Sequence, residues 1–130
     1  MTAEWAQERE AFGSPIAEYQ GISFPLADSL TELHAARLLT YHAAHAFDVL
    51  EDRKVVHGKV SMAKLFASEM AGRVADRAVQ ALGGRGYMTE NAAARFYREL
   101  RVDRIWEGRA RSSARSSPAA SSSAAPRRIS

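Results

Sequence analysis

The spacing of apolar residues is the feature that most constrains the fold of this chain. One run recurs at helical intervals, which places its side chains on one face of a helix: Leu26, Leu30, Leu33, Tyr41, Ala44 and Phe47. A second run has the same spacing: Val56, Val60, Ala63, Ala67, Met70, Val74, Ala78 and Ala81. The sequence therefore predicts two long helices, the first from Phe24 to near Glu51.

Other residues mark where the helices begin and end. The second long helix is expected to end at Gly83-Gly84, because glycine adopts a left-handed C-cap at little cost. Asn91 is a suitable N-cap for a shorter third helix. Residues 2–10 are typical of a further short helix, which the segment AFGSPI separates from the long helices.

The helix lengths favour one architecture. The Gln20-Gly21 pair is expected to break the chain before the first long helix. No stretch alternates polar and apolar residues, so no strand is expected. Two helices of this length would each be about 40 Å long, which suits helices packed side by side in alternating directions. We expect an all-α fold, an incomplete antiparallel (up-and-down) helix bundle.

The last 22 residues differ in composition from the rest of the 130-residue chain. Residues 109–130 contain eight Ser, six Ala, five Arg, two Pro and a single Ile. Such a segment cannot bury enough apolar surface to offset the entropy of ordering, so we expect one helical domain at residues 1–108 and then a disordered tail. Residues 1–108 carry 13 basic and 15 acidic groups, so the net charge of +3 comes from the tail. The helical domain gives no electrostatic indication of a nucleic-acid partner.

Several classes of protein are excluded by what the sequence lacks. The chain has no Cys, which excludes disulfides and Cys-ligated metals and makes a cytoplasmic location the expectation. The N-terminus lacks the apolar stretch of a signal peptide, and no apolar run is long enough to span a bilayer. His42 and His45 could share a metal, but no third ligand lies nearby, so ordinary histidines and no metal site are expected.

A basic stripe precedes the end of the helical domain: Arg95, Arg98, Arg101 and Arg104. Glu99 and Asp103 lie among these arginines, which indicates a salt-bridged face toward solvent or an interface rather than a track for phosphates. Trp5 and Trp106 are interpreted as packing residues.

Three segments are specific in combination. They are EREAFGSPIAEYQ, QALGGRGY and ARFYRELRVDRIWEG, which begin at Glu8, Gln80 and Ala94. Their order, their spacing and the helices between them resemble the C-terminal helical domain of the acyl-CoA dehydrogenase family. The resemblance covers residues 4–108 and is specific to the superfamily rather than to one acyl chain length.

The resemblance implies a reaction of fatty acid metabolism. The family enzymes are homotetramers in which FAD lies between an N-terminal helical domain, a middle β-domain and this C-terminal bundle. They remove the α-proton of an acyl-CoA thioester while the β-hydride passes to the flavin, which requires a carboxylate at the α-carbon. By resemblance, Glu107 in IWEG is this catalytic base. Taken alone, a Glu after Ile-Trp is more typical of a solvated helix end.

The resemblance also assigns six residues to the FAD of a neighbouring subunit: Arg9, Phe12, Gln20, Gln80, Gly83 and Gly84. Arginine suits this role because its planar fork binds pyrophosphate oxygens in pairs. Phe12 would pack near the same dinucleotide. The two glycines would let the backbone approach the adenosine half. An ordinary helix C-cap explains the same glycine pair, and both interpretations can hold together.

The resemblance stops after Gly108. Family members continue with Thr-Ser-Glu-Ile-Gln-Arg or similar, and then with a last long helix that closes the bundle. Here residues 109–114 read RARSSA. The codons ACG AGC GAG ATC CAG CGC encode the family segment and, read one nucleotide later, encode RARSSA. We therefore hypothesise that residues 109–130 are a frameshift product, which would leave apolar faces of the long helices uncovered.

Together these observations predict a truncated fragment of an FAD-dependent acyl-CoA dehydrogenase that is inactive alone. The N-terminal and β-domains would supply the walls that hold the flavin and the acyl-CoA substrate. The expected partners are other subunits of a homo-oligomer or a partner flavoprotein. A non-catalytic helical assembly module that docks onto a flavoprotein partner is the alternative from a different class, and a degraded gene product is a third.

Overall fold

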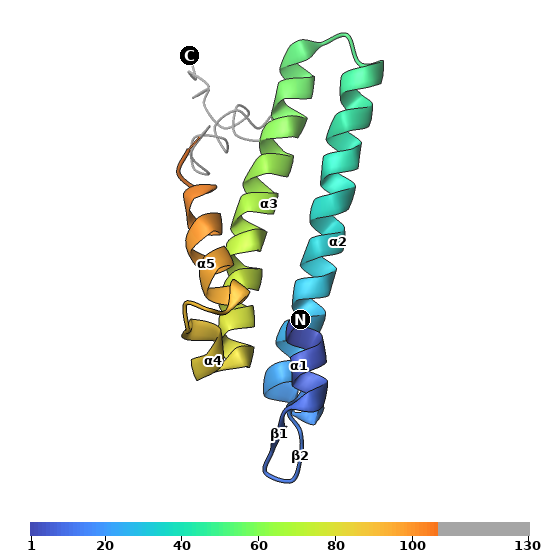
Figure 1. The fold of residues 1–130 in the computed structure, drawn as a ribbon. Coiled ribbons are helices and arrows are strands. Elements are labelled where there is room, and N and C mark those ends of the chain that lie inside the picture. The colour runs from blue at the N-terminus through green and yellow to red at the C-terminus, as the bar shows by residue number, and fades with distance from the viewer. Residues whose placement is uncertain (107–130) are drawn as a thin grey trace, which may run out of the picture.

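The computed structural model describes residues 1–106 as a set of helices with one small hairpin (Figure 1). In chain order the elements are α1 Thr2–Glu8, β1 Glu10–Ala11, β2 Ser14–Pro15, the 3-10 helix η1 Ile16–Glu18, α2 Gln20–Val49, α3 Arg53–Leu82, α4 Gly84–Tyr87 and α5 Ala92–Val102. The expected disordered tail, together with Glu107 and Gly108, lies outside the described residues.

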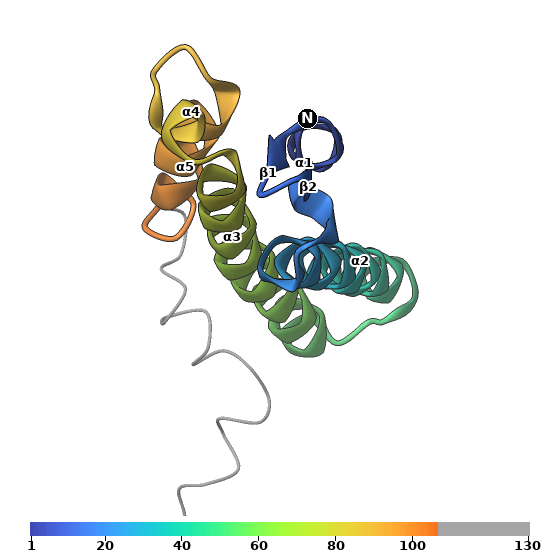
Figure 2. The same ribbon diagram turned by 90° about the horizontal axis from the view of Figure 1, so that it is seen from below.

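The long helices form an open row. α2 and α3 run antiparallel and in contact, and α5 turns back along another side of α3 (Figure 1 and Figure 2). α1 contacts α3, and the β1–β2 hairpin lies at the end of the row where α2 begins and α3 ends. Because α3 lies between α2 and α5, the described helices do not close around a common centre. This arrangement confirms the predicted all-α, incomplete antiparallel bundle.

The predicted helix ends are confirmed at two places. Gly83 follows α3 with φ 61° and ψ −145°, a positive-φ conformation that side chains disfavour. Asn91 precedes α5, and its side-chain oxygen accepts a hydrogen bond of 2.9 Å from the N–H of Ala93. Asp52 similarly caps α3 by accepting a 2.9 Å hydrogen bond from the N–H of Lys54.

The start of α2 differs from the prediction. The helix begins at Gln20 instead of Phe24, so the Gln20-Gly21 pair does not break the chain. The N–H groups of Ile22 and Ser23 donate to the carbonyl of Tyr19 at 2.9 and 3.0 Å, which nucleates the helix there. Glycine weakens a helix mainly in its interior, and the N–H groups of the first turn lack intrahelical partners in any case. Gly21 is therefore tolerated.

The β1–β2 hairpin differs from the expectation that the chain forms no strand. Its antiparallel pairs are Glu10 with Pro15 and Ala11 with Ser14. The two residues between the strands, Phe12 and Gly13, have φ of 53° and 88°, as in a type I′ turn. Strands of two residues are too short to produce an alternating pattern, so they leave no periodic signal in the sequence.

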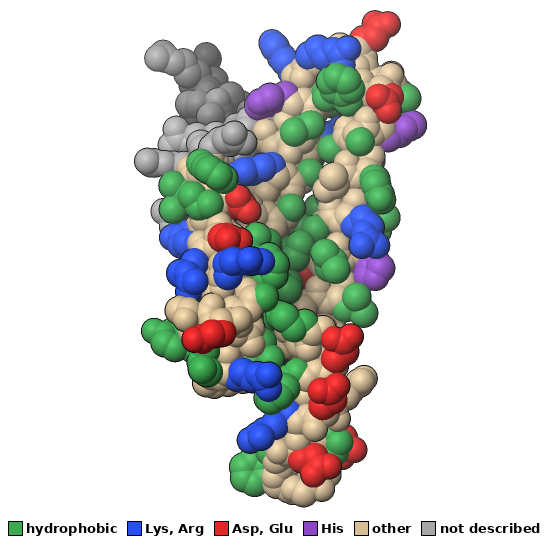
Figure 3. All heavy atoms as spheres, viewed as in Figure 1, with side chains coloured by type: hydrophobic (Ala, Val, Ile, Leu, Met, Phe, Trp, Pro, Cys, Tyr) green, Lys and Arg blue, Asp and Glu red, His purple; other side chains and the backbone are tan. Residues whose placement is uncertain are grey.

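The buried apolar side chains are mostly small: Ala6, Ala36, Ala43, Ala46, Val56, Ala63, Met70, Ala75, Leu82, Ala93 and Ala94. α2 buries only its three alanines against the rest of the described chain. The predicted apolar face of α2 is largely exposed, since Leu30, Tyr41 and Phe47 are each more than half accessible to solvent. Figure 3 shows hydrophobic side chains gathered along α2. Uncovered apolar faces agree with the expectation for an incomplete bundle.

None of the helices in residues 1–106 combines the length and apolar character needed to cross a membrane. The cytoplasmic location stays a prediction.

Candidate functional site

A cavity of about 390 Å³ lies at the end of the molecule where α1 meets the last turn of α3. Its lining residues are Trp5, Arg9, Ile16, Gln80, Ala81, Leu82, Gly83, Gly84 and Arg85. We call it the end pocket. It brings together four of the six predicted cofactor-binding residues, although they come from two segments far apart in the chain: Arg9, Gln80, Gly83 and Gly84.

The backbone of Arg9 is fixed on both sides. Arg9 is the C-cap of α1, and its N–H donates to the carbonyl of Trp5 at 2.8 Å. Its own carbonyl accepts a hydrogen bond of 2.8 Å from the N–H of Ile16, which follows the hairpin. The local fold therefore holds the base of the Arg9 side chain beside the end pocket.

The glycines of the segment QALGGRGY differ in what a side chain would meet. A Cβ atom on Gly83 or Gly84 would have no neighbour within 4 Å. A Cβ atom on Gly86 would lie 2.7 Å from the Cβ of Leu82 and 2.8 Å from the carbonyl oxygen of Val79. Packing within the described chain thus explains Gly86, and the positive φ explains Gly83. Neither explains Gly84, whose bare backbone faces open space beside the pocket.

Within residues 1–106, the lining of the end pocket carries positive charge without a carboxylate to neutralise it. Its lining contains two arginines and, among the described residues, no Asp or Glu. Arginine guanidinium groups, a glutamine amide and accessible glycine backbone are suited to oxygen-rich anions such as phosphates. The donor set therefore fits the diphosphate-bearing half of a dinucleotide.

Two residues of the pocket were missed as binding candidates. The guanidinium carbon of Arg85 lies 4.8 Å from the centroid of the Trp5 ring, a cation–π contact. The sequence alone favours a packing role for Trp5 and singles out Arg85 only as part of a glycine-rich segment. One signal was available, because Trp5 precedes Arg9 by four residues and so lies on the same side of α1.

Phe12 and Gln20 do not line the end pocket. Phe12 sits at the tip of the hairpin with its side chain 99% exposed, and its ring contacts Tyr19 edge to face at 6.3 Å between centroids. The Tyr19 hydroxyl donates to the carbonyl of Ala11 at 2.8 Å and braces the hairpin. Gln20 is exposed at the start of α2. Both residues belong to the hairpin end of the molecule and are accessible to a partner.

The predicted base Glu107 lies outside the described residues. Its neighbour Trp106 is 56% exposed, and its indole N–H donates to the Asp103 carboxylate at 3.1 Å. The interpretation of Trp106 as a packing residue is therefore wrong for the described part of the chain, in which no covering element reaches it.

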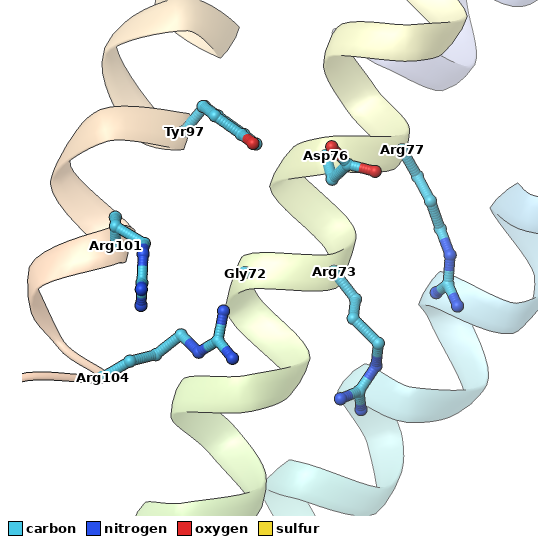
Figure 4. Close-up of a pocket in the computed structure, with 7 residues that line it drawn as sticks. All are labelled: Gly72, Arg73, Asp76, Arg77, Tyr97, Arg101 and Arg104. Carbon is cyan, nitrogen blue, oxygen red and sulfur yellow. The ribbon is translucent and has the colours of Figure 1, made fainter. Parts of the chain in front are cut away.

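A second cavity, of about 450 Å³, is lined by residues of α3 and of α5 with the turn that follows it (Figure 4). Its arginines are largely neutralised, since Arg73 and Arg77 share Glu32 of α2 at 3.2 and 3.3 Å. Arg104 pairs with Glu69 of α3 at 2.7 Å. The expected salt-bridged stripe forms only in part. Arg95 pairs with Glu99 at 3.8 Å, whereas Arg104 finds its acid on α3, outside the stripe.

His42 makes a contact unrelated to metal binding. The ammonium group of Lys59 donates to His42 Nε2 at 2.8 Å across the α2–α3 interface. Within residues 1–106 there is no group of three or more His, Cys, Asp or Glu side chains that could hold a metal ion.

Comparisons with known proteins point to one family. The family model described as acyl-CoA dehydrogenase, C-terminal domain, matches residues 1–115. The mitochondrial short-chain specific acyl-CoA dehydrogenase of Rattus norvegicus is 47% identical over 106 residues, which cover 81% of this chain and 25% of that protein. This chain therefore spans about a quarter of the length of the curated relatives that it matches.

Two solved structures share the fold. The butyryl-CoA dehydrogenase of Megasphaera elsdenii aligns with a TM-score of 0.82 and 35% identity, over 92% of this chain and 30% of that one. A chain from a structure described as the electron transferring flavoprotein of Acidaminococcus fermentans aligns with a TM-score of 0.84 and 34% identity, over 95% of this chain and 32% of that one.

Proposed function

The chain belongs to the acyl-CoA dehydrogenase family, whose C-terminal domain it matches, and on this premise we propose that it is the helical part of an FAD-dependent acyl-CoA dehydrogenase. In this proposal the segment works only within an assembly, as one subunit of a homo-oligomer or beside a partner flavoprotein chain. We further propose that its domain consists of residues 1–108 and that residues 109–130 are not part of that domain.

The end pocket is the observation that supports this proposal. Arg9, Gln80, Gly83 and Gly84 meet there in a cavity whose lining is positive and has no carboxylate among the described residues. We propose that this pocket holds the diphosphate and adenosine half of an FAD whose flavin lies in a neighbouring subunit. Phe12 and Gln20 would reach the same cofactor from the exposed hairpin end.

We assign the proton transfer to Glu107. Its carboxylate would accept the α-proton of the acyl-CoA thioester, which is the step that a positioned general base accelerates. When bound, FAD supplies the acceptor for the hydride that leaves the β-carbon. Arg9 and the glycine pair take no part in proton or hydride transfer in this scheme. They would hold the diphosphate and adenosine half of FAD, which keeps the flavin correctly placed against the substrate.

Reconstitution tests the proposal. The full 130-residue chain is mixed with a short-chain acyl-CoA dehydrogenase truncated before its own C-terminal helical domain, and the complex is isolated by gel filtration. We expect flavin absorbance and butyryl-CoA dehydrogenation only in the mixture. Stoichiometric FAD binding by this chain alone, with reduction of that FAD by butyryl-CoA, would contradict the proposal.

Glu107→Gln separates the catalytic role from assembly. In the reconstituted complex we expect this variant to keep its FAD content and to lose dehydrogenation by a factor of about 100 or more, since general bases contribute roughly 10²–10⁴ in rate. Glu90→Gln, an exposed acid in the loop before α5, is the matched control and should keep full activity.

The exposed apolar face of α2 favours a second candidate function, a non-catalytic module that docks onto a flavoprotein partner. The same reconstitution distinguishes the two. If the chain is a docking module, it should bind the partner, and Glu107→Gln should not change the dehydrogenase activity of the complex. The catalytic proposal requires that activity to fall in the same variant.

A further inference from the structure

The end pocket contains a second guanidinium group in addition to Arg9. Arg85 lies over the Trp5 ring, with 4.8 Å between the guanidinium carbon and the ring centroid. Within residues 1–106, the side chains of Arg9 and Arg85 form neither a hydrogen bond nor an ion pair. The N–H donors of a guanidinium point outward in its plane, and an aromatic ring beside it covers only one face. The donors of Arg85 therefore stay available to a ligand.

Trp5 is a fixed platform for Arg85. The adjacent Ala6 is completely buried, and α1 packs on α3. The carbonyl of Trp5 accepts a hydrogen bond of 2.8 Å from the N–H of Arg9. This bond fixes the backbone of Trp5, whose ring contacts Arg85, relative to the backbone of Arg9. The end of α1 thus supplies Arg9 and the ring on which Arg85 of α4 rests, and both arginines line the end pocket.

The comparison with the second cavity shows why this pair matters. Along α3, Asp76 lines the cavity, and Glu32 and Glu69 pair with its arginines (Figure 4). The end pocket has two arginines and no such compensation in the described chain. Two adjacent phosphates offer matching acceptors for two guanidinium forks, which bind phosphate in a bidentate manner.

We propose that Arg85 is a second diphosphate-binding residue, that Trp5 positions it, and that with Arg9 it enables this chain alone to bind a nucleoside diphosphate. The inference rests on the proposed function, because it assigns new residues to the same cofactor half-site. The cavity of about 390 Å³ is large enough for the diphosphate and part of its nucleoside.

Titration of the full chain with ADP tests this proposal. The two tryptophans are Trp5 and Trp106, so the Trp106→Phe variant reports fluorescence from Trp5 alone. We expect a saturable change in that fluorescence, weaker binding at higher salt, and no comparable change with adenosine. Equal binding of adenosine and ADP would overturn the proposal, because the phosphates would then contribute nothing.

Calorimetric titration of variants identifies the residues. We expect Arg85→Gln to weaken ADP binding about tenfold, the loss of one charge-assisted pair, with partial recovery in Arg85→Lys. Trp5→Phe keeps a ring under the guanidinium and should stay within about threefold of the parent chain, whereas Trp5→Leu should weaken binding further. The matched control is Arg53→Gln, since Arg53 stacks on Phe47 at 5.0 Å at the opposite end of α3.

The outcomes separate this inference from the proposed function. If Arg9→Gln weakens ADP binding and Arg85→Gln does not, Arg85 has no binding role and the proposed cofactor pocket still stands. If the parent chain does not bind ADP, the inference fails, while FAD retention in the reconstituted complex decides the proposed function independently.

Discussion

Adjacent glycines at the end of α3 differ in the role that each residue plays. Gly83 has φ 61° and ψ −145°, a conformation that is open to glycine and strained for other residues. Gly84 has no positive φ, and a Cβ atom there would meet nothing within 4 Å. Gly83 is therefore needed for its backbone conformation. Gly84 is not, and we infer that it leaves space for a ligand.

This difference predicts different effects of a Gly→Ala substitution at the two positions. We expect Gly83→Ala to lower the free energy of unfolding by about 1–3 kcal/mol, the usual cost of a strained backbone conformation. Gly84→Ala should leave stability nearly unchanged and reduce FAD retention in the reconstituted complex. Urea unfolding followed by circular dichroism measures the first effect and flavin absorbance the second. Equal stability losses in both variants would contradict this assignment.

Among the elements, the β1–β2 hairpin stores strain at its tip. Phe12 adopts φ 53° although its ring is 99% exposed and gains little from packing within the chain. A non-glycine residue in this region costs roughly 1–2 kcal/mol, and Asn tolerates it better than an aromatic residue. A strained, exposed aromatic side chain at a tip is suited to insertion into a partner surface.

Phe12→Asn should therefore raise stability and lower function together. We expect the free energy of unfolding to rise by about 0.5–1 kcal/mol, because Asn-Gly is favoured in type I′ turns. FAD retention in the reconstituted complex should fall. Phe24→Asn is the matched control, since Phe24 is also exposed but lies within α2, and that variant should gain no stability. A stability loss in Phe12→Asn would refute the strain argument.

In the molecule as a whole, the described helices form a row that leaves the large apolar side chains of α2 uncovered. The buried residues of α2 are three alanines, so the packing of α2 contributes little burial of large side chains from this helix. An apolar face of this extent favours association with other protein surfaces. We propose that another polypeptide covers this face of α2.

Charged residues on this face should therefore suppress self-association. We expect the triple variant Leu30→Glu, Tyr41→Glu and Phe47→Glu to sediment as a monomer at concentrations where the parent chain forms larger species. Leu38→Glu is the control, because Leu38 is 69% exposed and lies outside the predicted apolar face. Identical sedimentation of the parent and the triple variant would show that this face is not a contact surface.

The gene sequence tests the origin of the tail. If residues 109–130 result from a shift of one nucleotide, the alternative frame after the codon for Glu107 should encode Thr-Ser-Glu-Ile-Gln or a close variant, followed by an apolar helical pattern. DNA sequencing of that region decides the matter. An alternative frame without such a segment would make the tail an original part of the gene.

Local patterns in the amino-acid chain were sufficient to predict the four longer helices α1, α2, α3 and α5 and their order, because helical periodicity and capping act over a few residues. The short helices η1 and α4 were not predicted. The end of α3 at Gly83 and the cap at Asn91 are such local features. The same patterns could not predict the hairpin around Phe12, because strands of two residues are too short to show a period. Family resemblance supplied Arg9, Gln80, Gly83 and Gly84 as candidates without showing that they meet.

Which helix faces are buried, and which arginines find a carboxylate, depends by contrast on how the helices pack. Spacing places the α2 residues on one face, but burial depends on which neighbour is present, and α3 packs on the alanines instead. Arg85 and Arg104 are both arginines near an element end in sequence. Packing gives Arg104 the carboxylate of Glu69 and sets Arg85 on Trp5 beside Arg9, because partners distant in sequence are brought together only by the fold.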